Sequence, residues 1–537
     1  MSKLTTHYNP RLTPQSEPIP GSNQVANSAG GYAWAVDDWA RMQRFLILGT
    51  DGGTYYISEK KLTVDNAESV RRCLATDGPR AVKLIREISV EGRAAKQEPT
   101  LFALAMVCGT PTDPSVTKLA WSVFPEIVRT GTHLFTFINF LKAFCGWGRS
   151  KRNAIANWYL SKDVEALGYQ VTKYQQRNGY THYDALRLSH PKTKSVGHNN
   201  LFKWIKSQYK EGFEVIGTDV LPTSVQAFEA VRCIQSAKDA VGIINHFGKK
   251  ISWEMIPTEF IGEAIVWQAL LPNLPLTAMI RNLGRMTANG AIKPMSLESQ
   301  WVINALTNEE WIKKARVHPI QMLSAMAVYS QGHGARGNLA WKPVSQITDA
   351  LDEGFYLSFG NVEPANKRTL VGLDVSSSMG CELVGVPGLS CAIGGAAMSM
   401  VTARSESQYQ VMGFSDDLVD LNITPKMRLD DIVQKTRRMN FGRTDCALPM
   451  MHAGSVGIDV DTFIIYTDNE TWAIRPHPSQ ALDQYRQKRG IDARLIVVAM
   501  AANPFTIANP NDPGMLDCIG FDTATPNVIS NFSAGRI

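Results

Sequence analysis

The chain has 537 residues, of which 44% are hydrophobic and 19% are charged, and its formal net charge is +6. This composition is ordinary for globular proteins and excludes a collagen-like, a disulfide-scaffold and a wholly disordered chain. The length is several times that of a typical domain, so we expect at least two domains, and no stretch reaches the roughly 18 uncharged apolar residues that a membrane span needs.

Two features bear on the cellular compartment. The eight cysteines are scattered without any CxxC pair, which is typical of reduced thiols and not of a disulfide frame or a zinc site. The N-terminal segment lacks the apolar core of a secretory signal. We therefore expect a cytoplasmic protein, with the nucleus as a second candidate compartment and no membrane association.

Charge is unevenly distributed along the chain. Residues 361–537 contain 15 basic and 19 acidic side chains, a net charge of −4, which leaves +10 on residues 1–360. A basic first part joined to a mildly acidic second part suggests that one module contacts a polyanion. A solvated lysine-rich surface explains the same totals equally well, so the positions of the charges matter more.

The first part of the chain is predicted to be mainly helical. Residues 1–30 are rich in Ser, Pro, Asn and Gly, and we expect a flexible tail. The β-prone runs of Arg44–Ile57 flank Asp51-Gly52-Gly53, which is typical of a β-hairpin. From about residue 64 to 331, apolar residues recur at helical spacing between short Gly, Pro or Asp breaks. We expect residues 31–360 to form an α-solenoid of HEAT-like helix pairs.

Strands alternate with helices after residue 361. The predicted strands lie at about 369–375, 409–414, 462–466 and 493–499, and the intervening helices at about 389–403, 429–439 and 478–488. This alternation predicts a parallel, doubly wound sheet in an α/β domain over residues 361–537. Ligands of such sheets bind at the carboxyl ends of the strands.

Oxygen-bearing side chains gather at those strand ends. Asp374, Ser376 and Ser378 form a DxSxS element after the first strand, Thr444 lies in a later loop, and Asp468 follows the third strand. Two carboxylates and three hydroxyls form a hard oxygen site that suits Mg²⁺, with Mn²⁺ as the alternative, and that leaves a coordination position open. The pattern resembles the metal-ion-dependent adhesion site of von Willebrand factor A domains. The alternative is an A-type domain whose site is structural or empty.

The strongest candidate for anion contact is the segment between residues 149 and 210. Lys173 and Arg177 are four residues apart and would share one face of a helix, and Lys203 and Lys206 begin a second basic stripe that includes Lys210. Interleaved Trp and Tyr rings could stack on unpaired bases while the cations contact phosphates. The alternative is a solvated helix face with its aromatic rings in the core. Further basic residues of the segment include Arg187 and His190, and the histidine precedes Pro191 at an expected helix end, where capping is slightly favoured over phosphate contact.

Other motifs point away from an enzyme. Gly332–Gly337 matches GxGxxG but follows a helical run instead of a strand, so we interpret it as an interhelical loop in which Arg336 could meet a polyanion. Neither GxSxG nor HExxH occurs, so the common hydrolase signatures are missing.

Several longer motifs together resemble one family. DGGTYYISEKKL, FLKAFCGWGRSKRNAIANWY, DALRLSHPK, GLDVSSSMG and IIYTDNETW are similar to segments of the Ro (SS-A) ribonucleoprotein autoantigens, in which a TROVE domain precedes a von Willebrand factor A-like domain. The resemblance implies that the helical repeats close into a ring with a basic hole, formed by a single chain that needs no partner subunit.

The resemblance also implies a function and a set of residues. Ro proteins bind small Y RNAs on the outside of the ring and single-stranded 3′ ends of misfolded noncoding RNAs in the hole, in noncoding RNA quality control and without catalysis. Lys173, Arg177 and His190 would lie in the Y RNA-binding face, which overrules capping as the role of His190. The alternative function is a metal-dependent protein-interaction scaffold, with a protein partner at the A-type domain.

Overall fold

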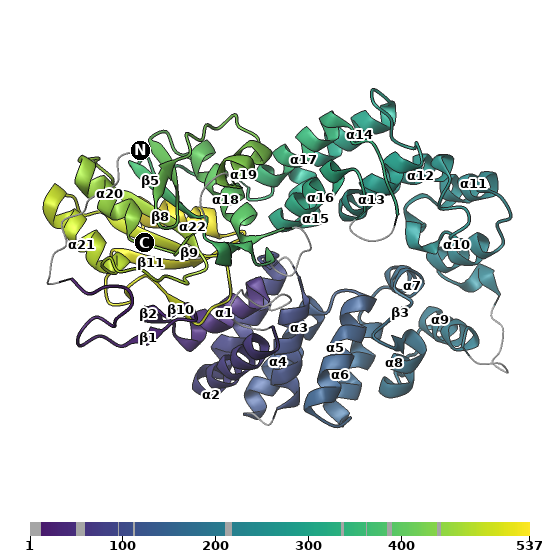
Figure 1. Ribbon diagram of the computed structural model, residues 1–537. Helices are drawn as coiled ribbons and strands as arrows, with labels where there is room; N and C mark the ends of the chain where they lie inside the picture. Colours follow the sequence, from purple (N-terminus) through teal and green to yellow (C-terminus); the bar gives the residue numbers. More distant parts are fainter. Residues whose placement is uncertain are drawn as a thin grey trace.

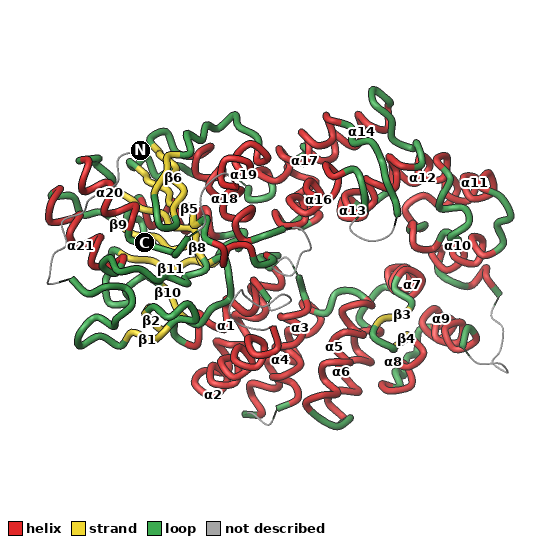
Figure 2. The backbone as a smooth tube through the Cα atoms, in the orientation of Figure 1, coloured by secondary structure: helices red, strands yellow, loops and turns green. Residues whose placement is uncertain are grey.

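The computed structural model describes residues 12–49, 59–94, 96–110, 113–209, 217–334, 338–360, 362–383, 389–437 and 442–537. A curved row of helices leaves an α/β domain and returns to it, so that the elements surround a central gap (Figure 1). Figure 2 shows the long strands gathered in the α/β domain and helices over nearly all the rest. None of the helices in the described ranges is long and apolar enough to cross a membrane.

Seventeen α-helices precede the A-type domain within the described residues. Helices that are next or close to each other in the chain pack together around the curve, as expected for a helical-repeat solenoid. They are α1 (Asp38–Leu48), α2 (Glu59–Glu91), α3 (Glu98–Gly109), α4 (Pro114–Ile127), α5 (Gly131–Phe144), α6 (Arg149–Leu160), α7 (Val164–Lys173), α8 (His182–Ser189), α9 (Val196–Ser207), α10 (Thr223–Arg232), α11 (Ala237–Phe247), α12 (Ala264–Leu270), α13 (Leu276–Ala288), α14 (Leu297–Leu306), α15 (Glu309–Ala315), α16 (Pro319–Gln331) and α17 (Ser345–Leu357).

Local sequence accounts for how these helices begin and bend. Side-chain caps occur at many N-termini: the carboxylate of Asp163, for example, accepts hydrogen bonds from the first backbone N–H groups of α7. Helix α2 is interrupted at Asp77, whose φ of −154° is not helical, just before Pro79. The Asp77 carboxylate accepts the N–H of Arg80 at 2.9 Å and so caps the second half of the helix.

The A-type domain has the predicted parallel sheet. Its strand order is β11-β9-β8-β5-β6-β7, and only the short β7 runs antiparallel. Helices α18, α19 and α22 share a core with one face, and α20 and α21 with the other. The bounds are β5 (Thr369–Asp374), α18 (Cys391–Ser405), β6 (Tyr409–Phe414), β7 (Leu418–Asp420), α19 (Leu429–Arg437), α20 (Leu448–Val456), β8 (Thr462–Thr467), α21 (Pro478–Arg489), β9 (Arg494–Ala499), β11 (Met515–Ile519) and α22 (Thr525–Ser533).

The expectation of a flexible N-terminal tail over residues 1–30 is wrong for residues 12–30, while residues 1–11 lie outside the described part. β1 (Gln24–Ala26) pairs with β2 (Tyr32–Ala35), which in turn pairs with β10 (Phe505–Thr506) from the A-type domain. Gly31 fits here because a Cβ at this position would lie 2.1 Å from the carbonyl oxygen of Thr471. The composition of this segment gave no sign of these strands, because β2 pairs with β10, which lies about 470 positions later in the chain.

The predicted hairpin at Arg44–Ile57 is also wrong where it can be compared, since Arg44 to Leu48 belong to α1; residues 50–58 lie outside the described part. The Arg44 side chain is fully buried and anchors α1 to the A-type domain through Asp517, at 2.6 Å. It also donates a hydrogen bond to the carbonyl oxygen of Phe505 at 3.0 Å. A β-prone local sequence is overridden here by tertiary packing.

The two arms of the helical curve meet at Arg93, directly after α2. The Arg93 side chain binds Asp522 of the A-type domain at 2.5 Å, and its carbonyl oxygen accepts a hydrogen bond from Nε2 of His318, just before α16, at 3.0 Å. At the other junction, Arg404 of α18 pairs with Asp352 of α17 at 3.4 Å. These contacts close the ring, and the predicted fold class, a helical-repeat ring followed by an A-type domain, is confirmed.

Candidate nucleic-acid interface and metal centre

The predicted basic residues from Lys173 to Lys206 lie on α7, α8, α9 and a short hairpin between α7 and α8. Lys210 lies outside the described residues. The hairpin joins β3 (Gln176–Arg177) to β4 (Tyr180–Thr181). Asn178 and Gly179 form its turn with φ values of 52° and 76°, the left-handed geometry of an Asn-Gly hairpin turn. These elements lie on the part of the ring away from the A-type domain (Figure 1).

Lys173 and Arg177 do not share a helix face. Helix α7 ends at Lys173, and Arg177 projects from the exposed strand β3. The Nζ of the half-buried Lys173 lies 5.5 Å and 5.4 Å from the ring centres of Tyr169 and Tyr174, so cation–π contacts hold it in place. The residue spacing suggested a helix because the Asn-Gly turn signal directly after Arg177 went unrecognised.

The other predicted RNA contacts have different surroundings. Arg187, in the last turn of α8, and Lys203, in α9, are exposed, while Lys206 is half-buried. His190 is the exposed C-cap residue of α8, with a left-handed φ of 47° and its backbone N–H bonded to the Leu186 carbonyl. The backbone of His190 therefore ends the helix, and its imidazole lies on the surface. These positions suit phosphate contact, and RNA binding by these residues stays a prediction.

Three of the large aromatic rings in this segment are core residues. Trp158 and Tyr159 are fully buried, and Trp204 is 6% exposed. The phenol of Tyr159 and Nδ1 of His182 lie 2.8 Å apart. These three rings fill the space between helices and do not stack on bases. The tyrosines between residues 169 and 183 are half-buried, so base stacking by them stays a prediction. The stacked pair of Tyr183 and Tyr209, with ring centres 5.9 Å apart, is nearer the surface, and Tyr209 is 46% exposed.

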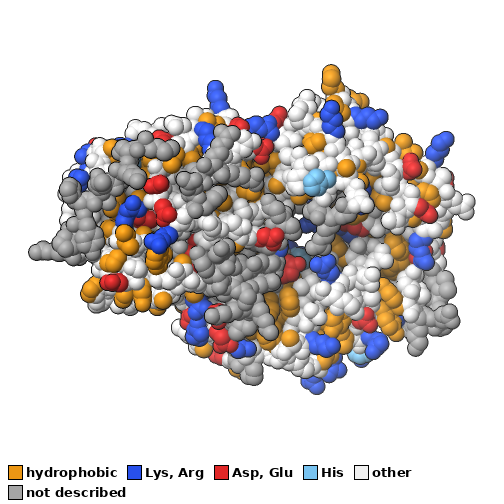
Figure 3. Space-filling view, in the orientation of Figure 1, with side chains coloured by type: hydrophobic (Ala, Val, Ile, Leu, Met, Phe, Trp, Pro, Cys, Tyr) orange, Lys and Arg blue, Asp and Glu red, His pale blue; other side chains and the backbone are white. Residues whose placement is uncertain are grey.

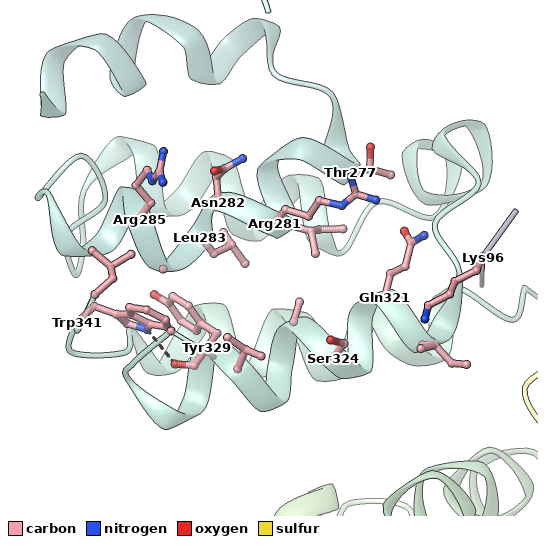
Figure 4. Close-up of a pocket in the computed structure, with 17 residues that line it drawn as sticks. Lys96, Thr277, Arg281, Asn282, Leu283, Arg285, Gln321, Ser324, Tyr329 and Trp341 are labelled. Carbon is pink, nitrogen blue, oxygen red and sulfur yellow. Dashed lines mark hydrogen bonds between the residues drawn. The ribbon is translucent and has the colours of Figure 1, made fainter. Parts of the chain in front are cut away.

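A central opening passes through the molecule, and Figure 3 shows it between the two arms of the ring, with charged side chains at its rim. Next to the meeting point of the arms, a cavity of about 510 Å³ lies between α13 and α16, reached by Lys96 from the segment after α2. Arg281 and Arg285 of α13 are exposed at this cavity, and Gln321 and Ser324 of α16 line its other wall (Figure 4).

Packing shapes the far end of this cavity. The Trp341 ring lies over Gly284, where a Cβ would meet ring carbons at 2.6 Å. Its indole N–H donates to the Tyr329 carbonyl at 2.9 Å (Figure 4). The residues that line this cavity were not predicted from the sequence, because arginines on one face of a packed helix pair form no recognisable sequence motif. Arg336, which was predicted as a candidate polyanion contact, lies outside the described residues. Gly334 and Leu339, on either side of it in the chain, line the cavity.

The five predicted metal ligands are all buried in the A-type domain. Asp374 ends β5 and Asp468 directly follows β8, so the two central strands bring both carboxylates to one edge of the sheet. One Asp374 oxygen accepts the N–H of Ser376 at 2.9 Å and the other accepts the hydroxyl of Thr467 at 2.7 Å. The Ser376 and Ser378 hydroxyl oxygens lie 3.1 Å apart.

The electrostatics of this site favour a cation. Burial and the carboxylate of Asp468 raise the pKa of Asp374 to about 7, and burial also raises the pKa of Asp468. Oδ2 of Asp468 is buried without a hydrogen-bond partner. Two neighbouring buried carboxylates, one with an unsatisfied oxygen, are costly without a positive charge between them. The donor set therefore fits a hard divalent ion such as Mg²⁺.

Neighbouring acidic groups have other partners. Asp445, next to the 6%-exposed Thr444, binds Arg475 at 2.8 Å and the amide of Gln15 at 2.7 Å. Glu470 accepts the N–H of Ala29 at 3.0 Å. Among the described residues no cluster of three His, Cys, Asp or Glu side chains could hold a metal ion, so the candidate site depends on its hydroxyls. Through Gln15 and Ala29, the N-terminal segment lies against the acidic groups next to the candidate metal site. The sequence did not predict this contact.

Comparisons with known proteins agree with this architecture, in which a ring of helical repeats is closed by an A-type domain. The TROVE domain family matches residues 25–231 and 221–328, and the Ro60 vWA domain family matches residues 368–533. The chain therefore belongs to the Ro60 family of TROVE-domain proteins, as the sequence motifs predicted.

Individual relatives match along nearly the whole chain. The RNA-binding protein RO60 of Deinococcus radiodurans is 41% identical over 100% of both chains. The protein of that name from Caenorhabditis elegans is 35% identical over 96% of this chain and 90% of its own. The crystal structure of the Deinococcus radiodurans RO (RSR) protein superposes with a TM-score of 0.71 at 40% identity and covers 93% of this chain and 100% of its own.

Proposed function

We propose that this protein binds noncoding RNA, with a structured small RNA of the Y type on the basic face. We define this face as Lys173, Arg177, Arg187, His190, Lys203 and Lys206. The observation that carries the proposal is the concentration of these side chains on α7 to α9 and the β3–β4 hairpin, with Arg177, Arg187 and Lys203 exposed. Phosphates bind such a surface largely independently of sequence. Two full-length relatives named RNA-binding proteins support the same conclusion.

The proposal includes a second site for single-stranded 3′ ends of misfolded RNAs in the central opening. The cavity between α13 and α16 supports it, because Arg281 and Arg285 supply charge and the amide of Gln321 supplies hydrogen bonds. A single strand is narrower than a folded RNA, so we propose that the 3′ end enters the opening while the folded part stays outside. The proposed activity is noncoding RNA quality control by a monomeric protein of the cytoplasm, with the nucleus as a second compartment, and it needs no catalysis.

Filter binding across a salt series tests this function. The probes are a Y-type RNA with and without a single-stranded 3′ tail. The double variant Lys173→Glu with Arg177→Glu should bind the structured RNA several-fold more weakly. The slope of log affinity against log salt concentration should also become less steep, by about 0.9 for each phosphate that is no longer neutralised. The matched control reverses two exposed lysines of the A-type domain, Lys426→Glu with Lys488→Glu. Equal affinity of the two double variants, both folded, would remove the basic face from the proposal.

A second candidate function is a metal-dependent protein-interaction scaffold. The unpartnered Oδ2 of Asp468 beside the Ser376 and Ser378 hydroxyls favours it. A bound divalent ion would be held by these residues and would supply an open coordination position for a partner's carboxylate. Pull-down from extract in Mg²⁺ or EDTA tests it with wild type and Ser376→Ala with Ser378→Ala. Partners retained equally under all four conditions would exclude this function.

A further inference from the structure

Two cysteines next to the candidate metal centre face each other at close range. The Sγ atoms of Cys381 and Cys391 lie 3.4 Å apart, although the residues are ten positions apart in the chain. Cys381 directly follows the short 3₁₀ helix that contains Ser378, and Cys391 is the first residue of α18. Neither thiol takes part in the proposed RNA or metal binding.

The backbone holds the two residues opposite each other. Glu382 and Ser390 form an antiparallel bridge, and the next pair outward is Cys381 with Cys391, whose N–H donates to the Cys381 carbonyl at 3.0 Å. This is one of the two hydrogen bonds of a hydrogen-bonded antiparallel pair, whose Cα atoms lie about 5.5 Å apart, inside the range of about 4.4–6.8 Å that disulfides use. The sulfurs need to approach by only about 1.4 Å to reach a bond length of about 2.05 Å.

The two thiols differ in access. Cys391 is 1% exposed and its Sγ also lies 3.3 Å from the carbonyl oxygen of Met500. Cys381 is half-buried. A small oxidant can therefore reach Cys381 first, while Cys391 is held in contact with it. An accessible thiol beside a resolving thiol is the arrangement of redox-sensing cysteines.

We propose that Cys381 and Cys391 form a reversible, peroxide-driven disulfide. The Cys381 sulfur attacks a peroxide oxygen, the O–O bond breaks, and with hydrogen peroxide the products are a sulfenic acid and water. The Cys391 sulfur then attacks the sulfenic sulfur, an S–S bond forms, the S–O bond breaks, and a second water leaves with the thiol proton. Two thiols are oxidised by two electrons and the peroxide is reduced; a dithiol reverses the reaction by exchange.

The disulfide would fasten the segment that carries the candidate metal ligands. The N–H of Cys381 donates to the carbonyl oxygen of Ser378 at 3.2 Å, so a bond to Cys391 links that segment covalently to the start of α18. In a reducing compartment the bond would form only during exposure to oxidant, as is typical of regulatory disulfides. This inference does not depend on RNA binding and goes beyond it.

Thiol counting and peptide mapping test the proposal on the full-length protein. Reduced protein is treated with increasing concentrations of hydrogen peroxide, denatured and alkylated, and its mass is measured by mass spectrometry. We expect the number of alkylated thiols to fall from the eight in the sequence to six at the lowest effective dose, with a 381–391 linked peptide that dithiothreitol cleaves. Cys391→Ser should instead accumulate sulfenic and sulfinic acid at Cys381, since the resolving thiol is gone.

Cys233→Ser is the matched control, because Cys233 is the exposed cysteine of the described residues and belongs to no such pair. This variant should retain the linked peptide at the wild-type dose. The proposal is overturned if wild-type Cys381 is oxidised to sulfinic acid without a linked peptide. It is also overturned if Cys233 and the other thiols react while Cys381 and Cys391 stay reduced.

Discussion

The guanidinium of Arg93 and the carboxylate of Asp522 form a buried ion pair with an N–O distance of 2.5 Å. Their side chains are 10% and 5% exposed, respectively, and 429 positions separate them in the chain. The pair lies where the first helical arm, the last helical arm and the A-type domain meet, because the Arg93 carbonyl also receives the hydrogen bond of His318. It thereby joins the ends of the ring.

Removal of one partner from this pair should destabilise the ring strongly. Asp522→Ala leaves the buried Arg93 guanidinium with only the 39%-exposed Glu87, at 2.9 Å, as its charge partner. Loss of one partner of a buried ion pair costs about 3–5 kcal/mol. Arg86→Ala is the control, because Arg86 pairs with Glu126 at 2.6 Å with both side chains 44% exposed, and such surface pairs contribute about 0–1 kcal/mol. Urea unfolding of both variants measures the difference, and similar decreases in stability would show that Asp522 is not a ring-closing residue.

The cavity between α13 and α16 should affect only RNAs that have a free single-stranded end. The double variant Arg281→Glu with Arg285→Glu should bind the tailed RNA about tenfold or more weakly than wild type, so that the 3′ tail no longer adds affinity. The reason is that two charge-assisted hydrogen bonds to phosphate are removed. Binding of the same RNA without a tail should stay at the wild-type level. Competition filter binding separates the two effects, and a parallel decrease for both RNAs would contradict a separate site.

A divalent ion should stabilise the A-type domain if it binds between Asp374 and Asp468. Millimolar Mg²⁺ should raise the melting temperature of wild type, since a ligand specific to the folded state stabilises it by mass action, and EDTA should reverse the rise. Ser376→Ala with Ser378→Ala should abolish the Mg²⁺ response. Differential scanning fluorimetry measures it, with Ser455→Ala on the exposed end of α20 as the control. An unchanged response in the double variant would exclude these hydroxyls as ligands.

His318 should make the ring sensitive to acid. Burial lowers the pKa of His318 to about 4, from an ordinary value of 6.5. Between these values the unfolded chain binds a proton that the folded protein does not, so the free energy of unfolding should fall as the pH decreases from 6.5 to 4. The test compares the urea unfolding midpoints of wild type and His318→Gln at about pH 7 and about pH 5. The midpoint of the variant should decrease less between these pH values than that of wild type. The same decrease in both proteins would assign the effect to other groups.

Much of the architecture was predictable because its signals are local. Helical periodicity marked the repeats, and alternating strands and helices marked the doubly wound sheet, since both patterns arise from backbone geometry over a few residues. Asp374, Ser376 and Ser378 were identifiable as one group for the same reason, as two-residue spacing after a strand directs side chains to one side. The motifs around His190, Asp374 and Asp468, with two longer motifs before them, were enough to predict the family.

Long-range packing decided what local patterns could not. Strand β10, more than 450 residues later, orders the N-terminal segment, and α1 is helical although its letters favour a strand, because Arg44 is buried against Asp517. Trp158 became core and Arg177 joined a hairpin, so the basic face is made from different elements than expected. The ring closure at Arg93 joins residues 429 positions apart in the chain. The contact of Cys381 with Cys391 depends on the antiparallel bridge between Glu382 and Ser390. Neither contact has a pattern in the local sequence that would predict it.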